Sequence, residues 1–325
     1  MPNHLLSAIM KSFSFRLPIT FLALFALFFA CKKNPAVVPI LPAKVTYATI
    51  EKMHEYFSPK ANSYTFDAAT PYTIVNTVTG TLINIQPNSF MLNGTLATGN
   101  ITVTVKELSN RGEMILSGIF TQTDDGKVLE SAGMIEVRAY KGSIELSLKS
   151  GSTIAVNMTN NGDQSKNDYQ LFTLKNNNWS LKPGAKAFAL ADSGSSKYVK
   201  YFLGLDSLGW TNCDRYYDIN PKTDLHVKLD GGFDLMNTMV SVVLKSNRVA
   251  CSLIRDLNKN EFSFSAGNYL GYPLGVEADI VVISVKDNYM YMIKKSLTIG
   301  NNETLTLKPE AISEADMVNI LKLLN

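Results

Sequence analysis

Histidine and cysteine are nearly absent from this chain. Its 325 residues include three histidines, three cysteines and two tryptophans. A zinc site needs three or four His, Cys or carboxylate ligands in a tight cluster, and the sequence contains no such cluster. A Ser-His-Asp triad needs a positioned histidine, but His226 lies in a Leu-His-Val strand pattern and no Gly-x-Ser-x-Gly motif occurs. We therefore predict a protein without enzymatic activity, metal or cofactor, in which His226 faces solvent from a strand.

Excess charge of either sign is also lacking. The formal net charge of the chain is +3. Lys11 and Arg16 are the only Lys, Arg, Asp or Glu residues before Cys31. If residues 1–30 are removed, 29 basic residues remain against 28 acidic ones, a net charge of +1. Nucleic acid binding requires a basic face. The near-neutral balance therefore excludes nucleic acid as an expected partner.

The only long apolar run lies near the N-terminus. It covers the 14 residues from Leu17 to Ala30, follows the basic Lys11 and Arg16, and ends in Ala30-Cys31. A helix of this length spans about 21 Å, less than the ~30 Å hydrocarbon core of a bilayer. A basic start, a short apolar segment and a small residue before an early cysteine are typical of a bacterial lipoprotein signal. We predict that residues 1–30 are a signal peptide and that Cys31 is lipidated and holds the protein to a membrane.

The two remaining cysteines, Cys213 and Cys251, leave two alternatives open. An extracytoplasmic compartment would permit a disulfide between them. The other alternative is two buried free thiols, a common state of this residue.

Period-two alternation dominates the rest of the sequence. Ile101, Val103 and Val105 alternate with polar residues, as do Leu225, Val227 and Leu229 in the second half. Such alternation is typical of half-buried antiparallel strands. The run from Ala278 to Val285 is nearly all apolar, which suits a central strand. These patterns predict an all-β fold with two β-sandwich-like domains in tandem.

Changes in composition predict the boundaries between these parts. Residues 31–62 contain Pro35, Pro39 and Pro42 and are expected to form a tether, with a short helix over 49–60. The first domain is expected over 63–183, a small-residue linker over 184–197 and the second β domain over 198–325. Ser313-Glu-Ala-Asp316 is a helix start signal, so a short helix is expected to close the second domain.

Parts of both halves resemble envelope proteins of Bacteroidota. The stretches that carry the first resemblance are 80–90, Asn93-Gly94, 99–108 and Leu129-Glu-Ser-Ala-Gly-Met-Ile-Glu-Val-Arg-Ala139. They are similar to a GAIN-like sandwich module, distantly like those of ankyrins and netrin receptors. Leu208-Gly-Trp-Thr-Asn-Cys-Asp-Arg-Tyr216 resembles a signature of uncharacterised lipoproteins of these bacteria. The resemblance implies a two-domain β lipoprotein and no particular activity. Some relatives of the module cleave themselves at a His-x-Ser or His-x-Thr turn, which this module lacks.

The densest polar and aromatic cluster in the sequence includes Trp210, Asn212, Asp214, Arg215 and Tyr216. Aromatic rings with charged neighbours can contact a carbohydrate or a peptide. The alternative, which a large aromatic side chain favours, is that these residues plug a domain junction, with Trp210 buried. We expect a non-catalytic binding or assembly module of the cell envelope, whose protein or glycan partner is not specified. The alternative is a carbohydrate-binding accessory protein or a hydrolase with a site on second-domain loops. Lys32 and the lack of an acidic run after Cys31 favour an outer-membrane lipoprotein that faces the periplasm over a surface-exposed one.

Overall fold

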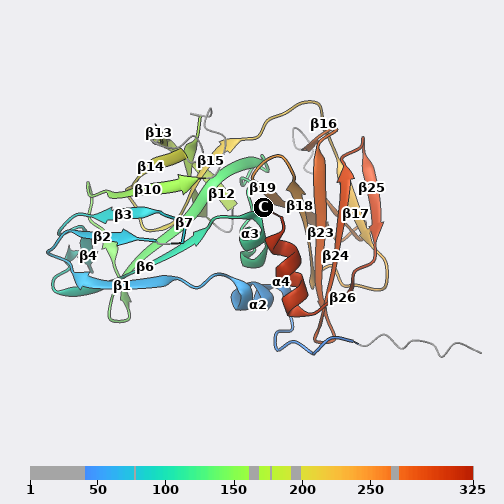
Figure 1. Ribbon diagram of the computed structural model, residues 1–325, viewed down its shortest axis with the longest axis horizontal. Helices are drawn as coiled ribbons and strands as arrows, with labels where there is room; N and C mark the ends of the chain where they lie inside the picture. Colours follow the sequence, from blue (N-terminus) through green and yellow to red (C-terminus); the bar gives the residue numbers. More distant parts are fainter. Residues whose placement is uncertain are drawn as a thin grey trace, which may run out of the picture. The chain divides into compact units, whose positions relative to one another are not determined.

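The described part of the chain folds into two sandwiches of β-sheets, with three short helices between them (Figure 1). The computed structural model describes residues 41–324, apart from 77, 161–167, 176–177, 192–198 and 265–270. Residues 42–325 form one compact unit. The prediction of an all-β fold is confirmed. The predicted signal peptide and Cys31 lie outside the described residues.

Sheets A and B form the first sandwich, and their neighbouring strands pair antiparallel. Sheet A has the order β1 (Asn62–Asp67), β6 (Asn100–Leu108), β7 (Leu129–Lys141), β15 (Gly209–Tyr216), β11 (Gln170–Lys175) and β12 (Asn178–Lys186), with β8 (Ile144–Glu145) beside β7. Sheet B has the order β13 (Phe188–Ala191), β14 (Val199–Leu205), β10 (Ile154–Asn160), β3 (Leu82–Ile85) and β2 (Tyr72–Val75). A small third sheet joins β5 (Thr95–Leu96), β4 (Phe90–Leu92) and β9 (Ser147–Leu148).

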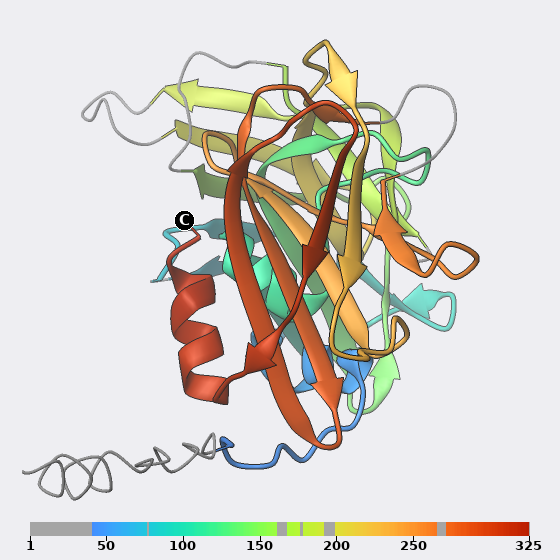
Figure 2. The same ribbon diagram turned by 90° about the vertical axis from the view of Figure 1, so that its right-hand side faces the viewer.

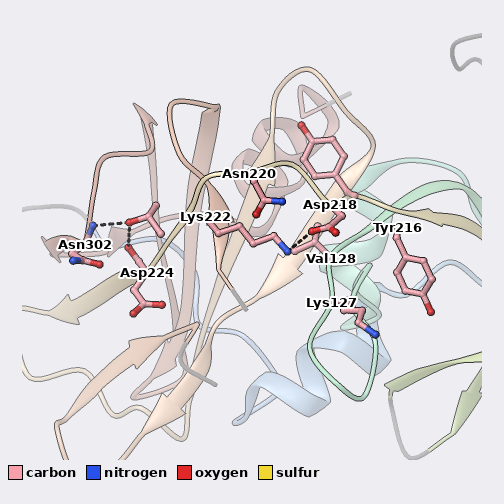
Figure 3. A pocket seen from close by; sticks show the side chains of 10 residues that line it. Lys127, Val128, Tyr216, Asp218, Asn220, Lys222, Asp224 and Asn302 are labelled. Carbon is pink, nitrogen blue, oxygen red and sulfur yellow. Dashed lines mark hydrogen bonds and ion pairs between the residues drawn. The ribbon is translucent and has the colours of Figure 1, made fainter. Parts of the chain in front are cut away.

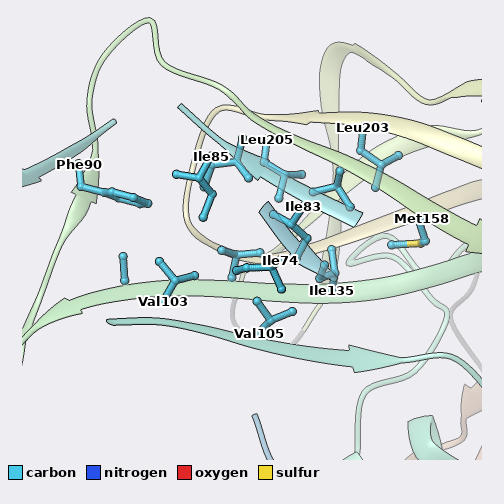
Figure 4. Packing of buried hydrophobic residues seen from close by; sticks show 14 of the residues in the cluster. Ile74, Ile83, Ile85, Phe90, Val103, Val105, Ile135, Met158, Leu203 and Leu205 are labelled. Atoms are coloured by element: carbon cyan, nitrogen blue, oxygen red, sulfur yellow. The ribbon is translucent and has the colours of Figure 1, made fainter. Parts of the chain in front are cut away.

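The core of the first sandwich follows from the alternation in the sequence. Ile101, Val103 and Val105 of β6 are buried, while the intervening Thr102 and Thr104 are half-buried on the opposite face. Figure 4 shows Val103 and Val105 opposite Ile83 and Leu203, which come from sheet B. Burying one face of each sheet in this way removes apolar side chains from water, which is the main favourable contribution to folding.

Sheets C and D form the second sandwich (Figure 2). Sheet C has the order β19 (Val249–Ser252), β18 (Thr238–Leu244), β23 (Glu277–Lys286), β24 (Tyr289–Thr298) and β26 (Glu310–Ala311). Sheet D has the order β20 (Ile254–Asp256), β21 (Glu261–Ser263), β17 (Leu225–Leu229) and β25 (Glu303–Leu307), and β16 (Lys222–Thr223) pairs separately with β22 (Tyr272–Pro273). As predicted, β23 is a central strand, and residues 278–285 are all buried because both faces of sheet C are covered.

The second face of sheet C packs against one face of sheet A through the helices α2 (Ile50–Phe57), α3 (Arg111–Ser117) and α4 (Glu314–Lys322). The apolar layer includes Met53, Met114, Met317 and Leu321 from the helices. The predicted helices over 49–60 and after Ser313 are confirmed. Thr49 and Ser313 are their N-caps and accept hydrogen bonds from Lys52 N and Asp316 N.

Two predicted boundaries are wrong. Strands β14 and β15 follow the predicted linker, yet they pair with β10 and with β7 and β11 of the first sandwich. The first sandwich therefore continues to Tyr216, because the missing central strand of sheet A comes from beyond the linker. The predicted tether also ends earlier than residue 62. Val45 and Tyr47 are buried between the sandwiches, and Val45 N donates to Asn288 O at 2.8 Å.

Candidate functional site

The five predicted contact residues all lie on β15, but they do not form one site. Strand β15 lies between β7 and β11 in the middle of sheet A. Alternate side chains of a strand point to opposite faces, so Arg215 is separated from the other four. Those four follow one face of sheet A, from Trp210 at one end of β15 to Tyr216 at the other. They occupy three different environments along that face.

Asn212 and Asp214 are fully buried and cannot contact a ligand in this structure. Ser131 Oγ donates to Asn212 Oδ1 at 2.9 Å, and Asn212 Nδ2 donates to Asp214 Oδ2 at 2.5 Å. Burial raises the pKa of Asp214 well above its ordinary value, although Ser131, Arg248 and Asn212 act in the opposite direction. The sequence prediction is wrong for these two residues, because the turn of the second sandwich that carries Arg248 packs on this part of sheet A.

Arg215 lies on the other face and forms ion pairs rather than an open contact surface. Its Nη2 atom is 2.5 Å from Glu130 Oε2, and its Nη1 atom is 3.4 Å from Asp168 Oδ2. Glu130 is buried. Since an unpaired buried carboxylate would be costly, we assign Arg215 the role of neutralising Glu130.

Cys213 and Cys251 are free thiols, so the disulfide alternative is not observed. Cys213 belongs to the core of the first sandwich and Cys251 to the core of the second. Burial raises the pKa of both thiols, to about 12 for Cys251. Two thiols that point into separate cores cannot pair.

The two histidines of the described chain, His54 and His226, pack against or pair with neighbouring residues of the fold. His226 lies on β17, as predicted, but it is only partly exposed and its Nδ1 atom is 2.9 Å from Oε1 of the buried Glu261. The prediction of a solvent-facing side chain is therefore wrong in this respect. His54 packs against Gly118, where an added Cβ would lie 2.4 Å from the ring. Burial lowers the pKa of His54 to about 4, which leaves the ring neutral at pH 7.

A cavity of about 720 Å³ lies where the chain passes from the first sandwich to the second. We call it the junction pocket. Its lining comes from three segments that are distant in the sequence: the turn before β7, the stretch from the end of β15 to β17, and the turn before β25. Figure 3 shows the lining residues, which are Lys127, Val128, Tyr216, Tyr217, Asp218, Asn220, Lys222, Thr223, Asp224 and Asn302. Tyr216 is the only one of the five predicted contact residues that reaches it.

Hydrogen bonds within each sandwich fix the walls of the junction pocket. Tyr217 N donates to Val128 O at 2.9 Å and holds the exit of β15 against the turn before β7. Asn302 N donates to Thr223 Oγ1 at 2.7 Å and joins the third segment to β16. Both bonds involve backbone donors, so the pocket is formed by the fold itself.

The charges of the junction pocket compensate one another. Lys222 Nζ is 2.5 Å from Asp218 Oδ1. Lys127 Nζ is 2.6 Å from Asp125 Oδ2 and 5.4 Å from the centre of the Tyr216 ring, and the hydrogen bond to Asp125 raises its pKa. With an aromatic ring, amides and paired charges, the pocket offers donors and acceptors without a strong excess charge. It is suited to an uncharged polar molecule.

Within the described ranges, no group of three or more His, Cys, Asp or Glu side chains could hold a metal ion. Sequence reasoning did not single out Asp218, Asn220, Lys222 or Asn302. The stretch from Tyr217 to Asp224 is polar and contains Pro221, which indicates a loop and nothing more specific. Its partners Lys127 and Asn302 are about 90 and 80 residues away in the sequence, and no local pattern connects them.

Searches against protein-family models and against curated proteins find no match to this chain. The resemblance to the GAIN-like module and to Bacteroidota lipoproteins therefore stays a prediction.

Proposed function

We propose that this protein is a lipid-anchored module of the bacterial cell envelope that binds a ligand without chemical conversion. The junction pocket is the observation that carries the binding role. It is concave, its walls are fixed by backbone hydrogen bonds, and Tyr216 and Asn220 line it. Pockets with these properties are the usual location of small-molecule sites. The neutral balance of the lining favours an uncharged ligand with hydroxyl groups, such as a short saccharide.

The anchor is supported by the sequence from Lys11 to Cys31. No helix in the part of the chain that the structure describes is long and apolar enough to cross a bilayer. Lipidation of Cys31 would attach the protein, since each buried methylene of an acyl chain contributes about 0.8 kcal/mol. We propose that the protein is an outer-membrane lipoprotein that faces the periplasm, with the membrane as its partner through Cys31.

Replacing Cys31 with serine is expected to abolish anchoring completely, because serine has no thiol to accept the lipid. The wild-type protein should be found in the membrane fraction and incorporate a labelled fatty acid, and Cys31→Ser should do neither. Cys213→Ala is the matched control, since it removes a buried thiol and should leave the labelling unchanged. Membrane fractionation of Cys31→Ser like the wild type would refute the anchor.

Substitutions in the junction pocket should weaken ligand binding by about tenfold each, the effect of losing one hydrogen bond of roughly 1.4 kcal/mol. We suggest a thermal-shift screen of neutral mono- and disaccharides, followed by calorimetry of the best ligand with Tyr216→Phe and Asn220→Ser. Tyr289→Phe removes a hydroxyl outside the pocket and should bind like the wild type. If none of these saccharides binds, or if both pocket variants bind as well as the wild type, the assignment of the pocket fails.

One observation favours the alternative of a hydrolase. Asp218 and Asp224 line the same pocket, and glycoside hydrolysis uses two carboxylates. However, Asp218 is ion-paired with Lys222, and Asp224 points away from that pair (Figure 3). The two carboxylates do not face a common point, which is why binding is the preferred function. Release of reducing ends from a polysaccharide by the wild type, and its loss in Asp218→Asn and Asp224→Asn, would establish the hydrolase instead.

A further inference from the structure

The face of sheet A that the helices cover becomes exposed beyond Trp210. Figure 1 shows α2, α3 and α4 between the two sandwiches, with the far ends of β6 and β7 extending past them. Trp210 pairs with Glu136 of β7, and Glu136 pairs with Lys106 of β6. Residues that are directly opposite on neighbouring strands project from the same face. These three side chains therefore form a row at the limit of the covered region.

Trp210 combines a fixed position with an accessible side. Part of its ring packs against the apolar layer between the sandwiches. The residue nevertheless lines two grooves, one of about 620 Å³ beside α2 and one of about 500 Å³ towards β11. Arg138 also lines both grooves, and it pairs with Thr104 one position further along the exposed face. An aromatic ring held by packing on one side can accept the apolar face of a ligand on the other.

Of the two cations at this surface, Arg138 is neutralised by carboxylates of the described chain and Lys106 is not. Arg138 Nε is 2.6 Å from Glu136 Oε1, and its Nη1 atom is 2.9 Å from Glu145 Oε1. Lys106 Nζ donates to Ser58 Oγ at 3.1 Å and lies 5.7 Å from the centre of the Trp210 ring. No carboxylate lies within ion-pair distance of Lys106 among the residues that the structure describes. Lys106 is thus a half-buried ammonium group beside an aromatic ring, available to an anionic ligand.

We propose that the two grooves beside Trp210 form a second binding site, separate from the junction pocket, for an acidic saccharide that contains uronic acid. A sugar ring stacks on Trp210, its carboxylate pairs with Lys106, and its hydroxyl groups donate to Glu136 and Glu145. Those two carboxylates only accept hydrogen bonds, so they suit the hydroxyl groups of a sugar ring. The grooves on either side of Trp210 accommodate neighbouring rings of the same chain.

Titration of the full extracytoplasmic chain with a short oligogalacturonate and with a neutral galactose oligomer tests this proposal. We expect the acidic oligomer to bind at least tenfold more tightly than the neutral one, and Trp210→Ala to abolish binding of both. Lys106→Met keeps the apolar stem over the ring and should remove only the preference for the acid. Lys52→Met, which removes an exposed, ion-paired lysine of α2, should behave like the wild type.

The results that would overturn the proposal are equally specific. They are absence of oligogalacturonate binding, equal binding of the two oligomers, and unchanged binding by Lys106→Met in protein with the wild-type melting temperature. Polyglutamate binding as tight as oligogalacturonate binding would overturn the saccharide assignment. Tyr216→Phe should not affect this site. Loss of oligogalacturonate binding in Tyr216→Phe would place the ligand in the junction pocket and refute a second site. Failure of the saccharide screen for the junction pocket would not by itself contradict the proposal of a second site.

Discussion

Replacing Arg248 with alanine is expected to lower the free energy of unfolding by about 3 kcal/mol, because the side chain joins the two sandwiches and lies beside buried polar groups. Arg248 lies in the turn between β18 and β19 of the second sandwich. Its Nη1 atom donates to Ala132 O of β7 at 3.2 Å, and its Nη2 atom donates to Ser109 O, just after β6. Its own carbonyl oxygen accepts from Ser131 N at 3.0 Å.

A second arginine makes the reciprocal connection. Arg111 of α3 is buried, and its guanidinium group donates to Leu244 O and to Asn247 O, the latter at 2.9 Å. Arg248 of the second sandwich therefore binds backbone carbonyl groups of the first sandwich and the segment after β6, and Arg111 of α3 binds backbone carbonyl groups of the second. Charged donors to carbonyl oxygens contribute more than neutral ones, and the vacated carbonyl groups would lie in a partly dry interface.

Urea unfolding measures this effect. Arg248→Lys should recover only part of the loss, because an ammonium group cannot occupy the two positions of the guanidinium group. Arg255→Ala is the matched control, since Arg255 donates to Thr238 O within the second sandwich and does not join the two sandwiches. Equal stability of Arg248→Ala and wild type would show that the apolar layer alone holds the sandwiches together.

Replacing Asp214 with asparagine is expected to stabilise the protein at neutral pH and to flatten its dependence on pH. Asp214 is fully buried, and burial raises its pKa well above the value of the unfolded chain. The folded protein therefore keeps a proton that the unfolded chain releases above about pH 4. Stability of the wild type falls as the pH rises from there towards the folded pKa. The slope is up to about 1.4 kcal/mol per pH unit.

Melting temperatures of the wild type and of Asp214→Asn between acid and mildly alkaline pH test the sign. We expect the curves to approach each other in acid, where the carboxyl group is protonated in both states, and to diverge as the pH rises. Asp230→Asn removes an exposed carboxylate at a turn and should follow the wild type. A variant that is less stable than the wild type at neutral pH would show instead that Asp214 is ionised and stabilised by Arg248.

Local sequence patterns predicted several strands and helices, because these patterns do not depend on which other segments pack against them. The alternation at Ile101, Val103 and Val105 predicted β6, and the apolar run from Ala278 to Val285 predicted the central strand β23. Helix α4 could be predicted from its N-cap Ser313. In contrast, α3 was not predicted. It has only seven residues between Asn110 and Gly118, and its N-terminal residues Arg111 and Gly112 show no apolar period.

The candidate site could be predicted only in part. Strand β15 was recognised as a concentration of polar and aromatic residues, but its neighbours in the sheet decide what each residue does. Asp214 is covered by the second sandwich, Arg215 pairs with Glu130, and Tyr216 reaches the junction pocket. Trp210 stays accessible because the helices end beside it.

The sequence by itself thus determined the β class, the helices at either end of the described chain, and the expectation of a lipid anchor at Cys31. These features depend on side-chain periodicity, caps and short motifs, which act between residues close in the chain. Only the tertiary structure decided that β14 and β15 complete the first sandwich, that Cys213 and Cys251 are in separate cores, and that a pocket forms at the junction. Strand pairing and burial join residues that are far apart in the sequence, such as Val45 and Asn288, and no local pattern specifies which distant segments meet.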